Sequence, residues 1–400
     1  MSPNSTHKVV VIGGGNAGLA TAAQLHRAGE TDIAVVEPSD THDYQPLWTL
    51  VGGGCAPQSA SRRSESSVMP KGATWVKDRA EGVDPDAKTV TTASGKVLGY
   101  EHLVMAPGIQ LDWGKIPGMA DAVDTPSVSS NYRYDLAPKT WERIRALRSG
   151  TAVFTMPAGP IKCAGAPQKI AYLAADHWRK EGVLDAIRVV LVLPTPGMFG
   201  VKEFADELEK VVAFYGIEVH KNSEVCAIDP DGRRATVRDN ANETTQEIAY
   251  DFMHVVPPQS APDWVKAGPL ADPDNPAGYV QIDKNTMQHT RYPDVFSLGD
   301  AGSSPNSKTG AAIRKQTPVV VANLRDHIAG RPLSASYGGY ASCPLTTARN
   351  KMLLAEFDYT MKPAPSFPVI DTTKSRRDMW YLKRYGLPFL YWNFILSGRA

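Results

Sequence analysis

Cys163 is the residue in this sequence whose surroundings most clearly suggest reactivity. It lies in "AGPIKCAGAPQKI" (158–170), where an apolar run ends and a helical pattern begins, and Lys162 precedes it. A thiol at a helix N-terminus beside a cation has a lowered pKa and reacts as the thiolate. A free cysteine is also often a small buried residue. The helix start and the lysine together favour a redox thiol.

A second cysteine, Cys343, lies far along the chain in "YGGYASCPLTTARNKMLLAEFDY" (337–359). It occupies a turn of small residues, and only folding could bring it to Cys163. Of the other two cysteines, Cys226 lies in an alternating strand pattern and is interpreted as a core residue. Cys55 lies in the glycine-rich loop "LVGGGCAPQSA", where packing is favoured over a third redox role.

A nucleotide-binding pattern opens the chain. "KVVVIGGGNAGLATAAQLHRAG" (8–29) predicts a strand, a glycine turn and a helix, and the next strand ends at Glu37. The glycines allow a tight turn, approach of a pyrophosphate and close helix packing, and the acid receives a ribose hydroxyl. The predicted contacts in this unit are Gly13, Gly15, Asn16, Ala17, Gly18 and Glu37.

Two later segments indicate that the nucleotide is FAD. "YEHLVMAPGI" (100–109), with Gly108, and "YPDVFSLGDAGSSPNSKTGAAIRKQ" (292–316) resemble flavin motifs of two-dinucleotide flavoproteins. In the second, Gly299 lets the backbone approach, and Asp300 can bind ribityl hydroxyls. The helix after Lys308 points its positive end at the flavin ring. Lys308 either stabilises reduced flavin or is an exposed surface lysine, and both interpretations stay open.

A second unit of the same kind carries Cys163 and lacks the glycine fingerprint. Residues 150–182 predict strand, turn and helix again, but Pro160 and Pro167 stiffen the turn. The next strand ends in "LPTP" (193–196), with no acid for a ribose. We therefore expect this unit to keep its fold without a nicotinamide site.

The predicted fold class is α/β, with two Rossmann-like dinucleotide-binding domains as in glutathione-reductase-like flavoproteins. We expect residues 1–115 and 291–335 to form the FAD domain. Residues 116–290 are expected to form the second domain, and 336–400 a C-terminal region with Cys343 and an amphipathic membrane or quinone segment.

That segment is "DMWYLKRYGLPFLYWNFILSGRA" (378–400). Aromatic residues mixed with Lys383, Arg384 and Arg399 are typical of a segment lying in the membrane interface. A quinone could enter there and stack near Phe357 or Phe389. The alternative is a segment packed on its own domain.

Composition excludes several classes of protein. The 400 residues carry a net charge of +1, so no nucleic-acid partner is expected, and four cysteines are too few for a secreted disulfide scaffold. No metal site is expected. No signal peptide, transit peptide or membrane span is recognisable. We therefore expect a peripheral protein on the cytoplasmic face of a bacterial inner membrane.

The chain resembles the sulfide:quinone oxidoreductases of the mitochondrial type. The resemblance rests on "YQPLWTLVGGG", "IKCAGAPQKIAYL", "SKTGAA", "YASCPL", "LLAEFDY" and "PFLYWNFIL". It implies that Cys163 and Cys343 are a redox pair, bridged as a disulfide or trisulfide and passing through a persulfide. It also implies FAD contacts at Gly15, Asn16, Glu37, Gln45, Ala80, Asp300 and Gly310.

The implied partners are hydrogen sulfide, a membrane quinone (ubiquinone or menaquinone) and a small sulfur acceptor such as sulfite, glutathione or coenzyme A. The alternatives are a membrane-associated NADH:quinone reductase, a flavoprotein that passes sulfide electrons to a cytochrome, and a non-enzymatic FAD-binding redox sensor. The quinone type, the sulfur acceptor, a homo-oligomeric state, covalent attachment of FAD and a role for Cys55 all stay open.

Overall fold

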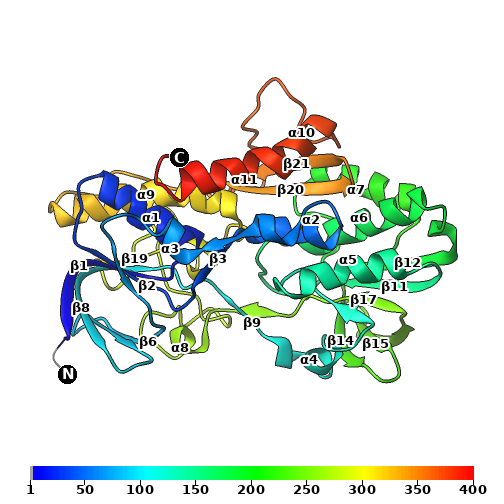
Figure 1. Cartoon of the computed structure of the whole chain (residues 1–400), viewed down its shortest axis with the longest axis horizontal. Coiled ribbons are helices and arrows are strands. Elements are labelled where there is room, and N and C mark those ends of the chain that lie inside the picture. The colour runs from blue at the N-terminus through cyan, green and yellow to red at the C-terminus, as the bar shows by residue number, and fades with distance from the viewer. Residues whose placement is uncertain (1–2) are drawn as a thin grey trace.

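The computed structural model describes residues 3–400, which form two α/β lobes joined near the middle of the molecule (Figure 1). The first lobe is built on a seven-stranded sheet of order β5-β2-β1-β8-β7-β6, with β19 also paired to β8. Its strands are β1 (Ser5–Ile12), β2 (Ile33–Val36), β5 (Thr74–Val76), β6 (Ala80–Asp84), β7 (Thr89–Thr92), β8 (Val97–Met105) and β19 (Val295–Ser297).

The parallel strands of this sheet end in one row. Ile12 pairs with Val36 on one side and with Met105 on the other, and Met105 pairs with Ser297. The turns that follow these strands therefore meet at one edge of the sheet. In open α/β sheets the ligand binds at this carboxyl edge.

The second lobe has a five-stranded parallel sheet of order β10-β17-β11-β12-β13 and a separate antiparallel sheet, β14-β15-β16. The strands are β10 (Val128–Ser129), β11 (Gly150–Thr155), β12 (Ile187–Val192), β13 (Glu218–His220), β14 (Ser223–Asp229), β15 (Arg234–Asp239), β16 (Thr244–Ala249) and β17 (Phe252–His254). The main helices are α5 (Leu136–Ala146), α6 (Ala166–Lys180) and α7 (Lys202–Tyr215). α6 is the longest of them and begins beside Cys163.

The chain crosses between the lobes at two short strands that pair with each other. β9 (Gln110–Leu111) leads out, and β18 (Gln259–Ser260) leads back. Buried side chains between Ala261 and Leu298, including Leu270 and Val280, belong to the core of the first lobe. The second lobe thus ends near residue 260, about 30 residues before the predicted boundary at 290.

The C-terminal part of the chain lies across both lobes (Figure 1). A hairpin of β20 (Ala341–Ala348) and β21 (Lys351–Phe357) comes first. A continuous helical segment follows, made of α10 (Arg377–Tyr381), a π-helical stretch (Leu382–Gly386), α11 (Leu387–Leu390) and a second π-helical stretch (Tyr391–Ile395). We call this segment, residues 377–395, the C-terminal helix.

The C-terminal helix has two unlike faces. One face is buried and includes Tyr391 and Trp392, which join the core of the first lobe. The other face exposes Tyr381, Tyr385 and Phe389, each between 57% and 62% exposed and spaced four residues apart. Among residues 3–400, none of the helices combines the length and the apolar character that crossing a bilayer needs.

His42 ties the C-terminal helix to the glycine turn of the first lobe. Its Nδ1 donates to the carbonyl of Gly14 at 3.1 Å, and its Nε2 accepts from the Tyr391 hydroxyl at 2.5 Å. The tautomer follows from these partners, because a carbonyl can only accept. Both side chains are buried.

Replacing Tyr391 with Phe should therefore leave the buried His42 Nε2 without a donor. An unsatisfied buried acceptor costs about 1–3 kcal/mol, so the thermal unfolding midpoint should fall by several degrees. Tyr385→Phe, at a 57% exposed position, is the matched control and should leave the midpoint unchanged. Equal midpoints for the two variants would show that the His42 contact contributes nothing.

Candidate active site

The glycine turn after β1 is shaped by close backbone contacts. A Cβ on Gly13, whose φ is 101°, would lie 2.2 Å from the carbonyl oxygen of Ala106, and one on Gly18 would lie 1.8 Å from the oxygen of Gly13. A Cβ on Gly15 would meet no atom within 4 Å. Open space therefore lies at the N-terminus of α1 (Asn16–Arg27), where a helix binds phosphate.

Two helix N-termini converge on this space. The second is that of α9 (Gly310–Ile328), and a Cβ on Gly310 would lie 3.5 Å from Asn16 Nδ2. A Cβ on Gly299, whose φ is 71°, would lie 3.0 Å from the Cβ of Ala17. Asn16 Oδ1 is buried without a hydrogen-bond partner within the described part of the chain. An orphaned polar atom and two positive helix ends fit the pyrophosphate of a dinucleotide.

The remaining predicted FAD contacts lie along the carboxyl edge of the sheet. Glu37 follows β2 and accepts from the amide of Gly14 at 2.7 Å and from a second amide two residues on at 2.8 Å. Burial raises the pKa of this carboxyl group. Gln45 is exposed, Ala80 is buried at the start of β6, and Gly108 has a φ of 73°. The residues present fit FAD.

Lys308 is buried, so its interpretation as a surface lysine is wrong. Its Nζ donates to the carbonyls of Asp300, at 2.7 Å, and Gly302, at 3.1 Å. It also lies 3.7 Å from the ring centroid of Tyr279. Burial lowers the pKa of Lys308 to about 8 and raises the pKa of Asp300. The position before α9 therefore carries a desolvated amine.

The Cys163 turn reaches from the second lobe to this same place. Its amide donates to the carbonyl of Lys308 at 2.9 Å. Its φ is 51°, a left-handed conformation that is costly for a side chain other than glycine. The Tyr132 hydroxyl contacts the Cys163 carbonyl at 3.2 Å and helps to hold the turn. Cys163 is thus fixed beside the N-terminus of α9.

Cys343 meets Cys163 because β20 packs across the start of α6. A Cβ on Gly165 would lie 2.4 Å from Leu345 Cδ2 and 3.5 Å from the sulfur of Cys343. The Cys343 thiol makes a hydrogen bond with Cys163. The fold therefore brings together the two cysteines that are far apart in the sequence. Leu345 of β20 also fills the space at the N-terminus of α6, where a dinucleotide phosphate would otherwise bind.

The two thiols have opposite tendencies to ionise. The hydrogen bond from Cys343 holds the pKa of Cys163 well below its usual value, and Lys169 lowers it further against the effect of burial. Lys169 Nζ lies 3.0 Å from the Cys163 sulfur. The pKa of Cys343 is raised by its hydrogen bond to Cys163 and by burial. The pair is best described as a Cys163 thiolate facing a Cys343 thiol.

The cation at the thiolate is not the one that the sequence suggested. The Nζ of Lys162, the expected neighbour, lies 5.9 Å from the ring centroid of Trp48. Lys169, which takes its place, is fully buried on the first turns of α6. The sequence feature that could have identified Lys169 is its position six residues after Cys163. Once the turn and the first turn of the helix form, this spacing places its side chain near the thiol.

Lys383 is a second residue that sequence reasoning placed wrongly. It was expected at the membrane interface, but it is only 4% exposed. Burial and the neighbouring Lys169 lower its pKa to about 7, and its charge acts on both Cys163 and Cys343. The helical spacing could have indicated this burial, because Lys383 lies four residues after Met379, which faces the interior.

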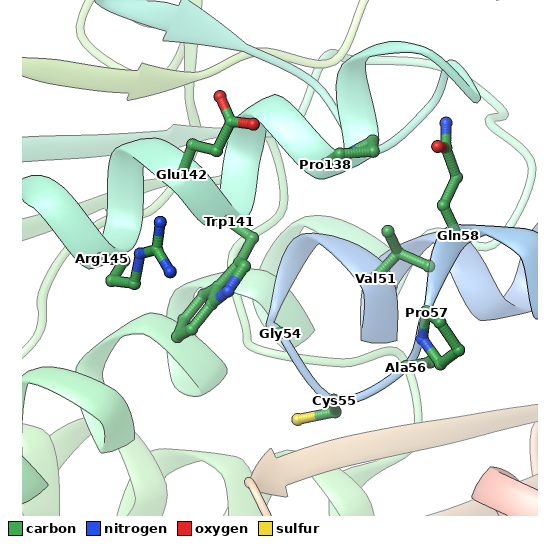
Figure 2. A pocket seen from close by; sticks show the side chains of 10 residues that line it. All are labelled: Val51, Gly54, Cys55, Ala56, Pro57, Gln58, Pro138, Trp141, Glu142 and Arg145. Carbon is green, nitrogen blue, oxygen red and sulfur yellow. The ribbon is translucent and has the colours of Figure 1, made fainter.

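The other two cysteines lie away from this pair. Cys55 lines an open cleft of about 570 Å³ between the loop after α2 (Trp48–Gly52) and α5, together with Trp141 and Arg145 (Figure 2). Burial raises the pKa of Cys55. Cys226 is half-buried at a bulge in β14 and not in the core, contrary to expectation.

Comparisons with known proteins identify the family of the chain. The model of the pyridine nucleotide-disulphide oxidoreductase family matches residues 7–314. The chain is 40% identical over 395 residues to "Sulfide:quinone oxidoreductase, mitochondrial" of Mus musculus, covering 98% of this chain and 87% of that protein. The protein of the same name from Dictyostelium discoideum is 41% identical, with coverage of 98% and 86%.

Among solved structures, the sulfide:quinone oxidoreductase of Aquifex aeolicus has the same fold. It superposes with a TM-score of 0.82 at 23% identity, covering 98% of this chain and 92% of that one.

These relatives correct one expectation. The predicted placement on the cytoplasmic face of a bacterial inner membrane is wrong, since the relatives with the higher identity are named as mitochondrial proteins. The predictions of an α/β fold class, an FAD cofactor and this activity are confirmed, while membrane association of the C-terminal segment stays a prediction. The chain belongs to the sulfide:quinone oxidoreductases, FAD-dependent enzymes of the pyridine nucleotide-disulphide oxidoreductase family.

Proposed function

We propose that Cys163 and Cys343 are the redox pair with which this enzyme oxidises sulfide. The observation that carries the proposal is the meeting of the two thiols, with Lys169 3.0 Å from the Cys163 sulfur, at the N-terminus of α9. In this polarised pair, Cys163 lies beside the N-terminus of α9, where FAD fits, and Cys343 belongs to β20.

FAD would be held by the two convergent helix N-termini, the glycine turn and Glu37. When bound, it accepts the two electrons released by sulfide oxidation and passes them to the quinone. The amine of Lys308 and the N-terminus of α9 supply positive charge on this side.

In the oxidised pair, hydrosulfide attacks the sulfur of Cys343. The bond between the two cysteines breaks, a persulfide forms on Cys343, and Cys163 leaves as a thiolate. The direction follows from acidity, because the thiol with the lower pKa leaves faster. Lys169 receives the thiolate that is released.

A small nucleophile then takes the outer sulfur from Cys343, which leaves as a thiolate, and the pair is re-oxidised as two electrons pass to FAD. Sulfite, glutathione and coenzyme A all have the nucleophilic sulfur that this step requires. A bridging sulfur between the two cysteines, giving a trisulfide, is the alternative resting form.

We further propose that the exposed face of the C-terminal helix rests on the lipid surface from which the quinone enters. Tyr381, Tyr385 and Phe389 form a solvent-exposed stripe, and aromatic side chains favour the membrane interface. The opposite face of the same helix packs in the core. An NADH:quinone reductase is disfavoured because β20 occupies the amino end of α6.

Replacing Cys163 or Cys343 with Ser should abolish reduction of the bound flavin by sulfide. We expect the rate under anaerobic conditions to fall on the order of a thousandfold, because each thiol is needed for the same bond. Flavin absorbance in a stopped-flow experiment measures it. Cys226→Ser, which alters a thiol in β14, should react normally. Normal reduction of the Cys163→Ser protein would refute the redox pair.

Lys169→Met should raise the pKa of Cys163, because the thiolate loses its hydrogen-bonding cation. With the pair reduced, alkylation of Cys163 by iodoacetamide at mildly acidic pH should slow by about tenfold or more, and its inflection should move to higher pH. Lys180→Met, on the same helix but paired with Asp176 at 2.7 Å, is the control. An unchanged inflection would mean that Lys169 does not stabilise the thiolate.

Changing Tyr381, Tyr385 and Phe389 together to Ser should weaken binding to lipid vesicles. Each aromatic side chain that lipid buries contributes about 1.5–3 kcal/mol, so losing three should weaken binding by about a thousandfold or more. Quinone turnover should fall with it, while flavin reduction by sulfide stays normal. Phe214→Ser removes an equally exposed aromatic residue on α7 and should change neither quantity. Undiminished vesicle binding by the triple variant would exclude this surface.

A further inference from the structure

The Cys163 turn has a backbone conformation that its place in the chain does not explain. Cys163 has a φ of 51°, in the left-handed region that residues with a side chain seldom adopt. Lys88, Arg233 and Glu243 share this conformation, but each lies in a turn between two strands that pair with each other. Cys163 instead lies between β11 and α6, a strand and a helix. Contacts from other parts of the molecule must therefore hold it.

Four backbone groups, the amides and carbonyls of Lys162 and Cys163, are bound by residues from elsewhere in the chain. The amide of Lys162 donates to Gln259 Oε1 of β18 at 2.9 Å. The amide of Cys163 donates to the carbonyl of Lys308, in the first lobe, at 2.9 Å. The Tyr132 hydroxyl, in the loop after β10, donates to the carbonyls of Lys162 at 3.1 Å and Cys163 at 3.2 Å. Both lobes therefore hold this dipeptide.

The hydroxyl that the two carbonyls share explains how the left-handed conformation is stabilised. Two successive carbonyl groups that accept from one hydroxyl point to the same side of the chain, and their dipoles repel each other unless a donor lies between them. Tyr132 is only 4% exposed, so water does not replace its hydroxyl. Without that hydroxyl, the carbonyl of Lys162 would lose this donor. The peptide group between Lys162 and Cys163 would then turn to find another.

We propose that Tyr132 is a positioning residue for Cys163, whose hydroxyl keeps the turn left-handed and thereby keeps the Cys163 sulfur against Lys169. The proposal rests on the redox pair proposed above and adds the residue that places its reactive thiol. The peptide group that Tyr132 fixes ends at the Cα of Cys163, so its rotation swings the side chain as well. The sulfur lies 3.0 Å from Lys169 Nζ, and a shift of about 1 Å would weaken this contact.

The proposed reaction depends on this placement in two steps. Cys163 leaves Cys343 as a thiolate, and Lys169 must be beside it when it does so. Cys163 later re-forms the bond to Cys343 as two electrons pass to FAD, which requires the two sulfur atoms to stay close together. Holding reacting groups in a fixed geometry raises the rate, and a misplacement of about 1 Å can lower it about 100-fold. Tyr132 acts on both steps without touching the reacting atoms.

The test uses the intact, FAD-loaded enzyme with Tyr132→Phe, which removes the hydroxyl and keeps the ring. Tyr172→Phe is the matched control, because that hydroxyl is also buried and donates to Gln168 Oε1 at 3.0 Å instead of to the turn. Gln259→Leu is a second variant, which frees the amide of Lys162.

Three quantities are measured for each protein. The first is the pH dependence of alkylation of Cys163 by iodoacetamide, with the pair reduced. The second is the anaerobic rate of flavin reduction by sodium sulfide, followed by stopped-flow absorbance. The third is the thermal unfolding midpoint, which reports the general cost of losing a buried hydrogen bond.

Tyr132→Phe should slow flavin reduction by about tenfold or more. Alkylation of Cys163 at mildly acidic pH should slow by about threefold or more, and its inflection should move to higher pH, because the thiolate lies farther from Lys169. Gln259→Leu should change both quantities in the same direction by a smaller factor, because the carbonyls stay bound. Tyr172→Phe should change neither, although its unfolding midpoint should fall as much as that of Tyr132→Phe.

A normal rate of flavin reduction or an unshifted inflection in Tyr132→Phe would overturn the proposal. Equal changes in Tyr172→Phe would also overturn it, because they would show a general effect of a lost buried hydrogen bond. If Tyr132→Phe does not fold, Gln259→Leu decides, and an unshifted inflection in that protein would overturn the proposal. The redox pair is tested separately, because its failure would appear as sulfide reactivity in Cys163→Ser.

Discussion

The contact between the Cys163 thiolate and the Lys169 ammonium is the interaction on which the rest of the site depends. Lys169 is fully buried, so the pair must be maintained with little help from water. Taking two charges out of water is costly unless their geometry is good and their other bonding needs are met. The left-handed turn at Cys163, the hydrogen bond from Cys343 and the packing of β20 meet that condition together.

The FAD side of the molecule could be predicted from the sequence because its signals are local. Gly13, Gly15 and Gly18 lie in one turn, and their conformations and close contacts follow from that turn alone. Lys169 and Lys383 could not be assigned in the same way. Both are buried and their charges act on the thiol pair, and this depends on how α6, β20 and the C-terminal helix pack. The prediction that Lys162 is the cation at the thiol was wrong for the same reason, because adjacency in sequence does not direct its side chain to the sulfur.

The C-terminal helix connects two properties that the sequence treated as alternatives. It both packs on its own domain, through Tyr391 and Trp392, and exposes an aromatic stripe on the other side. Because Lys383 is buried on the same helix, the segment whose exposed face we propose as a lipid surface also carries a charge that acts on the thiol pair. A shift of this helix would therefore change both at once, whereas a substitution confined to the exposed stripe would leave the thiol site intact.

The second lobe shows how one electrostatic arrangement can serve two chemistries. The start of a helix after a parallel strand stabilises negative charge, which in a dinucleotide-binding unit is the charge of phosphate. Here the turn before α6 carries a thiolate instead, and Leu345 from β20 occupies the adjoining space. A phosphate needs glycines so that it can approach the backbone, but a side-chain sulfur brings its own charge to the turn. The prolines and bulky residues that prevent this turn from binding phosphate are therefore compatible with the thiolate.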